Sequence, residues 1–182
     1  GLDAADVSIT NTDNDTAGIS VSAISGNTTE AGGTATFTVV LNSQPTADVT
    51  IGLSSSDLTE GTVAPASLTF TAANWNVAQT VTVTGVDDAL LDGNQTTPIT
   101  VAVVDASSDD AFDPVANQTV SVTTVDNDAA GFTLVESGGN TSVNESGTTD
   151  TFTVVLNAQP ASDVVLAVAS GDLTEATASP AT

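Results

Sequence analysis

The sequence predicts an all-β chain built from antiparallel β-sandwiches. Its 182 residues are 40% hydrophobic and only 13% charged, so a packed core is expected rather than disorder. Val and Thr, which favour strands, are abundant, whereas 14 Gly and six Pro interrupt the chain and leave no long helical pattern. A unit of 113 residues also recurs, which is the size of a typical β-sandwich domain.

The internal repeat is defined by several colinear matches. The segment 37–42, Phe-Thr-Val-Val-Leu-Asn, returns 115 residues later at 152–157, and the segment 57–60, Asp-Leu-Thr-Glu, returns at 172–175. The acidic tripeptide Asp13-Asn14-Asp15 returns 113 residues later as Asp126-Asn127-Asp128. We therefore expect an excerpt of a longer tandem array, in which residues 1–15 close one repeat, 16–128 form a complete repeat and 129–182 begin the next.

The strands of the complete repeat follow from alternation with a period of two. Seven or eight strands are expected, at residues 19–24, 34–41, 48–54, 62–64, 67–71, 80–84, 98–104 and 118–124. Apolar side chains fall on one face of each strand and Thr or Ser on the other, which indicates one buried and one solvated face per sheet. The expected core residues are Ala35, Phe37, Val39, Leu41, Val49, Ile51, Leu53, Leu68, Phe70, Val81, Val83, Ile99, Val101, Val103, Val120 and Val122. The half-repeat at 129–182 is too short to bury its own sheet face, so we expect a longer chain or a neighbouring copy to complete it.

The charge balance excludes several functions. The chain contains 23 acidic residues and no Lys, Arg, His or Cys, giving a formal charge of -23. Without imidazole, thiol or amine groups most catalytic chemistry is unavailable, and we expect no enzyme. Binding to nucleic acid and insertion into a membrane are not expected either, because no cationic residue and no apolar segment of spanning length is present.

The acidic residues gather where strands end, which points to hard cations. Calcium takes six to eight oxygen ligands, so several loops must converge on it. The candidate ligands in the complete repeat are Glu30, Asp57, Asp87, Asp88, Asp92, Asp126 and Asp128. Asp and Asn are also ordinary turn formers, and one acidic tripeptide alone proves nothing. Its recurrence at a junction, the adjacent pair Asp87-Asp88 and the absence of basic residues favour the cation.

Trp75 is the single tryptophan and has two interpretations. It could close one end of the sandwich, or it could be a platform on which a sugar ring stacks. We favour the first, because an aromatic platform normally needs more than one ring and the chain has no Tyr.

Three motifs resemble the Calx-β family. They are Thr29-Glu30-Ala-Gly-Gly33 before the strand 37–41, the segment 68–75 followed by 79–88, and the exit strand 120–128. The resemblance covers essentially the whole chain and implies tandem Calx-β, immunoglobulin-like antiparallel sandwiches that bind calcium at one end. It is closest to the Thr-rich repeats of large bacterial surface proteins.

Carried over residue by residue, the resemblance implies the ligands Glu30, Asp57, Asp87, Asp88, Asp92, Asp126 and Asp128. Asn127 and Gln95 stand where the family has acids, which implies fewer or weaker ions. The flanking repeats carry parts of the same site, with Asp13 and Asp15 before the complete repeat and Glu145 and Asp172 after it.

The function expected from these features is structural. We expect a segment of an extracellular or cell-surface adhesin, fibre or matrix protein, in which calcium rigidifies the junctions. Extracellular modules bind calcium at roughly 10⁻⁴–10⁻³ M, so millimolar calcium outside cells would fill them. The expected partners are neighbouring repeats of the same chain and copies of the chain in a filament. The alternative is a calcium-dependent glycan-binding or regulatory module of a larger surface protein.

Overall fold

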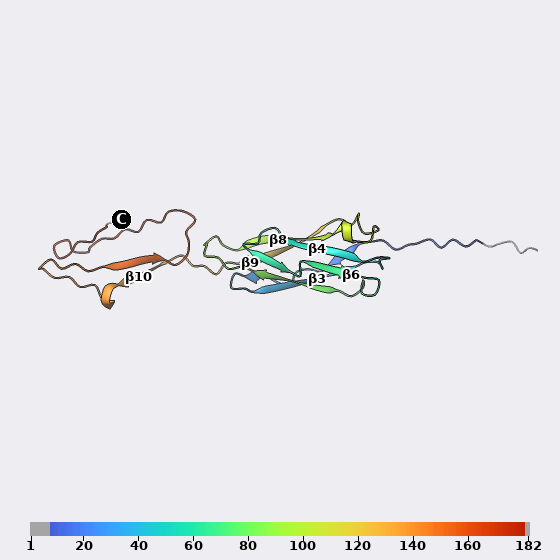
Figure 1. The fold of residues 1–182 in the computed structure, drawn as a ribbon. Coiled ribbons are helices and arrows are strands. Elements are labelled where there is room, and N and C mark those ends of the chain that lie inside the picture. Colours follow the sequence, from blue (N-terminus) through green and yellow to red (C-terminus); the bar gives the residue numbers. More distant parts are fainter. Residues whose placement is uncertain (1–7, 181–182) are drawn as a thin grey trace, which may run out of the picture.

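The computed structural model describes residues 8–180 and is all-β, as the sequence predicts. One β-sandwich is followed end to end by a smaller unit, and the N-terminal segment leaves the sandwich at the opposite end (Figure 1). The sandwich strands are β1 (Ile19–Val21), β2 (Thr28–Thr29), β3 (Thr34–Leu41), β4 (Val49–Ser55), β5 (Gly61–Ala64), β6 (Ser67–Phe70), β7 (Gln79–Gly85), β8 (Gln95–Val103) and β9 (Gln118–Val125). Residues 1–7, which belong to the expected first repeat, lie outside the described part.

The nine strands form two sheets. One sheet has the order β1-β3-β7-β5 and the other β2-β9-β8-β4-β6. The pairs within both sheets are antiparallel except β2 with β9, which are parallel. The expected antiparallel sandwich is therefore correct apart from this pair, which has consequences for the acidic residues described below.

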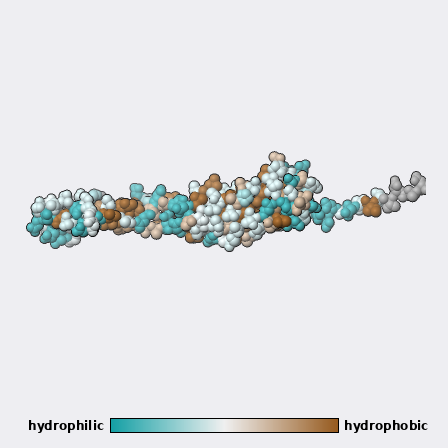
Figure 2. Space-filling view, turned by 60° about the horizontal axis from the view of Figure 1, so that its bottom comes forward, coloured by the Kyte–Doolittle hydropathy of each residue, from teal (hydrophilic) through white to brown (hydrophobic). Residues whose placement is uncertain are grey.

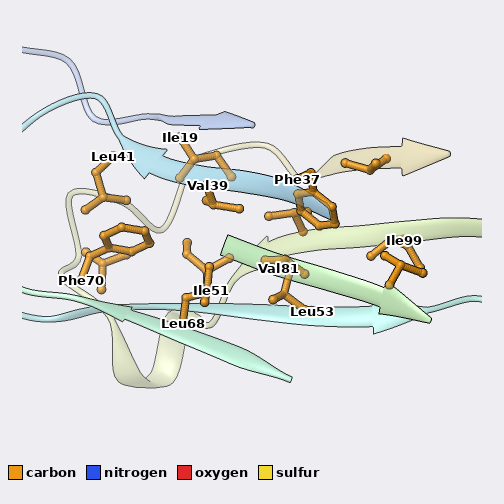
Figure 3. Close-up of a cluster of buried hydrophobic side chains, with 14 of the residues drawn as sticks. Ile19, Phe37, Val39, Leu41, Ile51, Leu53, Leu68, Phe70, Val81 and Ile99 are labelled. Carbon is orange, nitrogen blue, oxygen red and sulfur yellow. The ribbon is translucent and has the colours of Figure 1, made fainter. Parts of the chain in front are cut away.

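The core lies between the two sheets and is made of the inward faces of the strands (Figure 3). Every expected core residue is buried except Val103, which is half-buried and packs against the core. Phe112 is also fully buried, although it belongs to no strand. It follows the short 3-10 helix η1 (Asp105–Ser107), and alternation cannot reveal a core residue in such a connection.

Most strand boundaries lie within one residue of the expectation, and two differ by three residues for physical reasons. The first strand ends at Val21 rather than at residue 24, because the hydroxyls of Ser22 and Ser25 accept the N–H groups of Thr38 and Thr36 in place of a continuous ladder. The strand β8 begins at Gln95, three residues before Pro98, where polar residues hide the alternation. The strand β2 was not expected at all, since two threonines carry no periodicity.

The C-terminal unit (residues 131–180) contains the hairpin of β10 (Phe132–Glu136) and β11 (Phe152–Leu156), with the 3-10 helix η2 (Ser137–Gly139) between them. The hairpin pairs Phe132 with Leu156, as β1 and β3 pair Ile19 with Leu41. Its apolar face is open, since Phe152 is 38% exposed whereas the corresponding Phe37 is 1% exposed. Hydrophobic side chains are accordingly visible on this part of the surface (Figure 2).

These two phenylalanines allow a matched test of core packing. We expect Phe37→Ala to lower the free energy of unfolding by about 3–5 kcal/mol, because it opens a cavity in a filled core. Phe152→Ala, in the same local sequence, should change it by no more than about 0.5 kcal/mol. Urea unfolding followed by the fluorescence of Trp75, which packs against the sandwich core, measures both. Equal effects of the two substitutions would contradict the described core.

Candidate metal centre

The parallel pairing of β2 with β9 brings two acidic segments together. Thr28 lies opposite Thr124 and Thr29 opposite Val125. Because the two strands run in the same direction, the residues that follow them leave the sheet side by side. The Glu30 N–H donates to the Val125 carbonyl at 3.2 Å, and the Asn127 N–H donates to Glu30 Oε2 at 3.0 Å. Glu30 therefore lies directly beside the exit segment 126–128.

The close approach of β2 depends on a glycine in the neighbouring strand β7. A Cβ atom at Gly85 would lie 2.2 Å from the Thr29 carbonyl oxygen, a distance that no side chain can occupy. The buried hydroxyls of Thr28 and Thr124, 2.9 Å apart, fix the same pair from the inside. The local sequence thus holds the Glu30 backbone in place before any ligand is considered.

The exit segment is held by its own turn and by the loop after β7. The Asp128 N–H donates to Asp126 Oδ1 at 2.7 Å, and the Gly93 N–H donates to Asp126 Oδ2 at 2.8 Å. The Asn127 side chain donates to Asp87 Oδ1 at 3.0 Å. Asn127 therefore has a defined role, since it ties the exit segment to the acidic pair at 87–88.

Glu30, Asp126 and Asp128 form a compact group of carboxylates. One oxygen of each lies within 4.8 Å of the others. Glu30 is 2% exposed, and Asp128 Oδ2 is buried without a hydrogen-bond partner among the described residues. Buried polar atoms nearly always have a hydrogen-bond partner, so this unpaired carboxylate oxygen is an exception among the described residues.

Glu60, which the sequence did not single out, is a further buried acid on which the charges of Asp92, Asp88 and Glu30 act. It is 8% exposed, and no described residue donates a hydrogen bond to its carboxylate. Sequence reasoning chose Asp57 from the same segment, but Asp57 is exposed and its Oδ1 accepts the N–H and O–H of Thr59 at 2.9 and 2.6 Å. Asp57 therefore shapes the turn, whereas Glu60 is the buried acid of this segment. The feature of the sequence that could have identified Glu60 is its position directly before the strand β5.

The remaining predicted ligands fall into two sets, one at the rim of this group of acids and one far from it. Asp87, Asp88 and Asp92 lie on the loop after β7, and their charges act on the buried acids. We call Glu30, Glu60, Asp126 and Asp128, with this rim, the acidic cluster. Four predicted residues lie in segments outside the sandwich strands and outside this cluster, and all four are exposed: Asp13, Asp15, Glu145 and Asp172.

The electrostatics of the cluster oppose ionisation. Burial raises the pKa of Asp128, and the charges of Asp126 and Asp87 add to it. Burial likewise raises the pKa of Glu60, with further contributions from Asp92 and Asp88. The hydrogen bond from Asn127 lowers the pKa of Glu30, but burial and the nearby acids outweigh it, so the net shift is also upward.

Asp109 shows how the same chain satisfies a buried carboxylate without a cation. This residue, which the sequence did not single out, accepts the Thr46 hydroxyl at 2.7 Å and the Ala111, Ala47 and Thr46 N–H groups at 3.0, 2.9 and 2.6 Å. These donors hold its pKa far below the usual range. Asp128 and Glu60 differ from Asp109 because no described residue donates a hydrogen bond to their carboxylates, and the charges of nearby acids raise the pKa of both.

Trp75 lies in the connection between β6 and β7 and is half-buried against the core. Its carbonyl accepts the Leu41 N–H at 3.1 Å, and its N–H donates to the Thr71 carbonyl at 3.0 Å. The geometry is that of a packed side chain, which favours the structural interpretation of this residue over a sugar platform.

The raised pKa values predict an unusual pH dependence. Between the ordinary glutamate value of 4.5 and the raised folded values, the folded state binds more protons than the unfolded state, so stability falls as pH rises. In chelator, we expect the melting temperature to increase as pH is lowered from 7 toward 4.5. The low pKa of Asp109 leaves that window unaffected, because Asp109 is ionised in both states there.

Removing one buried charge should have the same effect at neutral pH. We expect Glu60→Gln to raise the melting temperature in chelator by roughly 5 °C, the shift that about 1 kcal/mol produces in a domain of this size. Glu136→Gln, at an exposed position, is the matched control and should change little. Differential scanning calorimetry at pH 7 measures both, and a lower melting temperature for Glu60→Gln would contradict the assignment.

Comparisons with known proteins do not assign a family. No family model and no curated protein matches the chain. Similar solved structures include SSP-19, an MSP-domain protein like family member in Caenorhabditis elegans, at 20% identity, covering 56% of this chain and 92% of that chain with a TM-score of 0.36. Another is WR4, a C. elegans MSP family member. It is 19% identical, covers 56% of this chain and 90% of that chain, and has a TM-score of 0.34.

A third similar structure is the ASH/PapD-like domain of human CEP192 (PapD-like domain 7). It is 10% identical, covers 71% of this chain and 99% of that chain, and has a TM-score of 0.41. In residues 8–180 no helix has the length and hydropathy needed to cross a membrane. These three TM-scores are below 0.5 and assign no role, so the structure itself shows an all-β chain with a sandwich and an acidic cluster at one end of it.

Proposed function

We propose that the sandwich is a calcium-binding structural module of an extracellular, Calx-β-like tandem array with repeats of about 113 residues. The observation that carries this proposal is the burial of carboxylates in the acidic cluster of a chain without Lys, Arg or His. No side chain of the protein can neutralise these groups at neutral pH. The counter-charge must come from protons or from a cation taken from solution.

Calcium fits the donors better than other common cations. Oxygen is the only ligand type in the cluster, and hard cations are the ions that oxygen ligands select. Magnesium demands a near-ideal octahedron at short distances, whereas calcium accepts irregular sets of carboxylates and carbonyls. Glu30, Glu60, Asp126 and Asp128 would hold the ion, and the acids at 87, 88 and 92 would add charge at the rim.

The position of the cluster supports a role at the junction between units. The loop that carries Asp87, Asp88 and Asp92 also contacts the C-terminal unit, since Gln159 N–H donates to the Ala89 carbonyl at 2.6 Å and Leu91 N–H to the Gln159 carbonyl at 3.4 Å. Leu91 lines an apolar pocket of about 220 Å³ together with Phe132, Leu156 and Pro160. An ion that orders this loop would therefore also restrain the next unit.

Calcium should stabilise the sandwich in a titratable manner. At a calcium concentration 100 times Kd, binding to the folded state alone contributes about 2.7 kcal/mol. We expect a corresponding rise in melting temperature, which Glu30→Gln and Asp128→Asn should abolish and the exposed-site control Asp48→Asn should retain. Isothermal titration calorimetry with calcium and with magnesium measures the same event. Equal binding of both ions, or no binding, would overturn the proposal.

Binding should also be felt across the junction. We expect amide hydrogen exchange at Leu91 and Gln159 to slow when calcium is added, because the loop that carries the rim acids makes both hydrogen bonds. Exchange around residues 146–150, in a part of the C-terminal unit without strands that does not line the apolar pocket, is the internal control. Calcium binding that leaves exchange at Gln159 unchanged would rule out a role in stiffening the junction.

A further inference from the structure

The loop between β7 and β8 contains the dipeptide Asp92-Gly93, and no other Asp or Asn of the sequence precedes a glycine. Gly93 has a positive φ of 78°, and both residues are exposed. A Cβ atom at Gly93 would meet no other atom within 4 Å, so open space surrounds the glycine. Because Gly93 has no side chain, little hinders an approach between the Asp92 carboxyl group and the Gly93 nitrogen.

The Asp92 carboxylate is less restrained than the other two acids of this loop. Asp88 Oδ1 accepts the Leu90 N–H at 2.7 Å, and Asp87 Oδ1 accepts the Asn127 side chain at 3.0 Å. No described residue donates a hydrogen bond to the Asp92 carboxylate, and only its main-chain carbonyl accepts one, from the Gln95 side chain at 3.3 Å. The Asp92 side chain can therefore turn toward the Gly93 nitrogen without breaking a hydrogen bond.

The acidic cluster holds the other reacting group, the Gly93 nitrogen. The Gly93 N–H donates to Asp126 Oδ2 at 2.8 Å, and the Asp126 N–H donates to Asn94 Oδ1 at 3.1 Å. These two hydrogen bonds fasten residues 93 and 94 to the exit segment. Attack by the nitrogen requires release of its N–H, so the reactivity of the dipeptide depends on how often the loop opens locally.

We propose that Asp92-Gly93 is a site of spontaneous isoaspartate formation, which the ordered acidic cluster holds back. The Gly93 nitrogen attacks Asp92 Cγ, the new N–Cγ bond forms, and the nitrogen proton and the carboxyl hydroxyl leave as water. Water then attacks the main-chain carbonyl carbon of Asp92 in the resulting succinimide ring, and the bond from that carbon to the Gly93 nitrogen breaks. One water leaves and one enters, and the main chain afterwards runs through Cβ and Cγ of Asp92.

The product alters the loop on which the acidic cluster and the junction depend. A β-linkage adds one carbon atom to the main chain, which displaces the Gly93 N–H from Asp126 and lengthens the loop that contacts Gln159. We therefore expect the modified chain to lose part of its stabilisation by calcium. In this effect of calcium, and in nothing else, the inference rests on the proposed function.

Digestion with an endoproteinase that cleaves before Asp but not before isoaspartate tests the proposal. The 182-residue chain is incubated in chelator at neutral pH in heavy-oxygen water, then unfolded, digested in ordinary water and analysed by mass spectrometry. The unmodified chain yields fragments 88–91 and 92–104, whereas the modified chain yields fragment 88–104. We expect fragment 88–104 to accumulate with time and to carry one heavy oxygen, against the background of the chain before incubation. No accumulation would overturn the site.

Three variants separate ring closure from loop opening. Asp92→Glu keeps a carboxylate but needs a six-membered ring, so its fragment 88–104 should take up no heavy oxygen. Asp126→Ala should speed accumulation in chelator roughly fivefold, the effect of one ordinary hydrogen bond on local opening. Asp48→Asn, at an exposed position outside the cluster, should react like the unmodified chain. Uptake by Asp92→Glu, or an unchanged or slower rate in Asp126→Ala, would contradict the proposed reaction and its restraint.

Calcium distinguishes this inference from the proposed function. At saturating calcium we expect accumulation to slow at least about tenfold, because the cation must leave before the loop opens. If calcium raises the melting temperature but leaves accumulation unchanged, the restraint by the cluster is wrong and the calcium-binding module stands. If calcium changes neither, the proposed function fails, and accumulation in chelator with its variants decides the inference alone.

Discussion

The structure depends on one electrostatic constraint, which is that acidic side chains must be buried in a chain that has no basic ones. A buried carboxylate then has only hydrogen-bond donors, protons or solution cations as partners. Asp109 takes the first route, with four donors around it. Asp128 and Glu60 have no such donors among the described residues, and the charges of nearby acids raise the pKa of both. The two ends of the same sandwich therefore solve the same problem differently.

The way the sheet is assembled decides where this constraint applies. A parallel pair of only two residues on each side places Glu30 against the segment 126–128, across nearly a hundred residues of sequence. Gly85 makes the approach possible, and Asn127 links the exit segment to Asp87. An antiparallel pairing would have carried the two acidic segments to opposite ends. The acidic cluster is thus a consequence of strand direction as much as of composition.

The cluster and the junction share the loop after β7, so charge and mechanics are connected. The loop brings rim acids to the buried carboxylates and hydrogen bonds to Gln159 of the following unit. Neutralising the cluster would relieve repulsion within the loop and steady its contact with the next unit.

The sequence by itself determined the strands and the core, because alternation at positions such as Phe37, Val39 and Leu41 is a local property that one buried face enforces. It also located the acidic loops. Only the tertiary structure decided that Glu60 rather than Asp57 is buried, that β2 exists, and that Asp109 has its own donors. Those features depend on which distant segments meet and in which direction they run. Two threonines or one turn carry no local sequence pattern from which that meeting could be predicted.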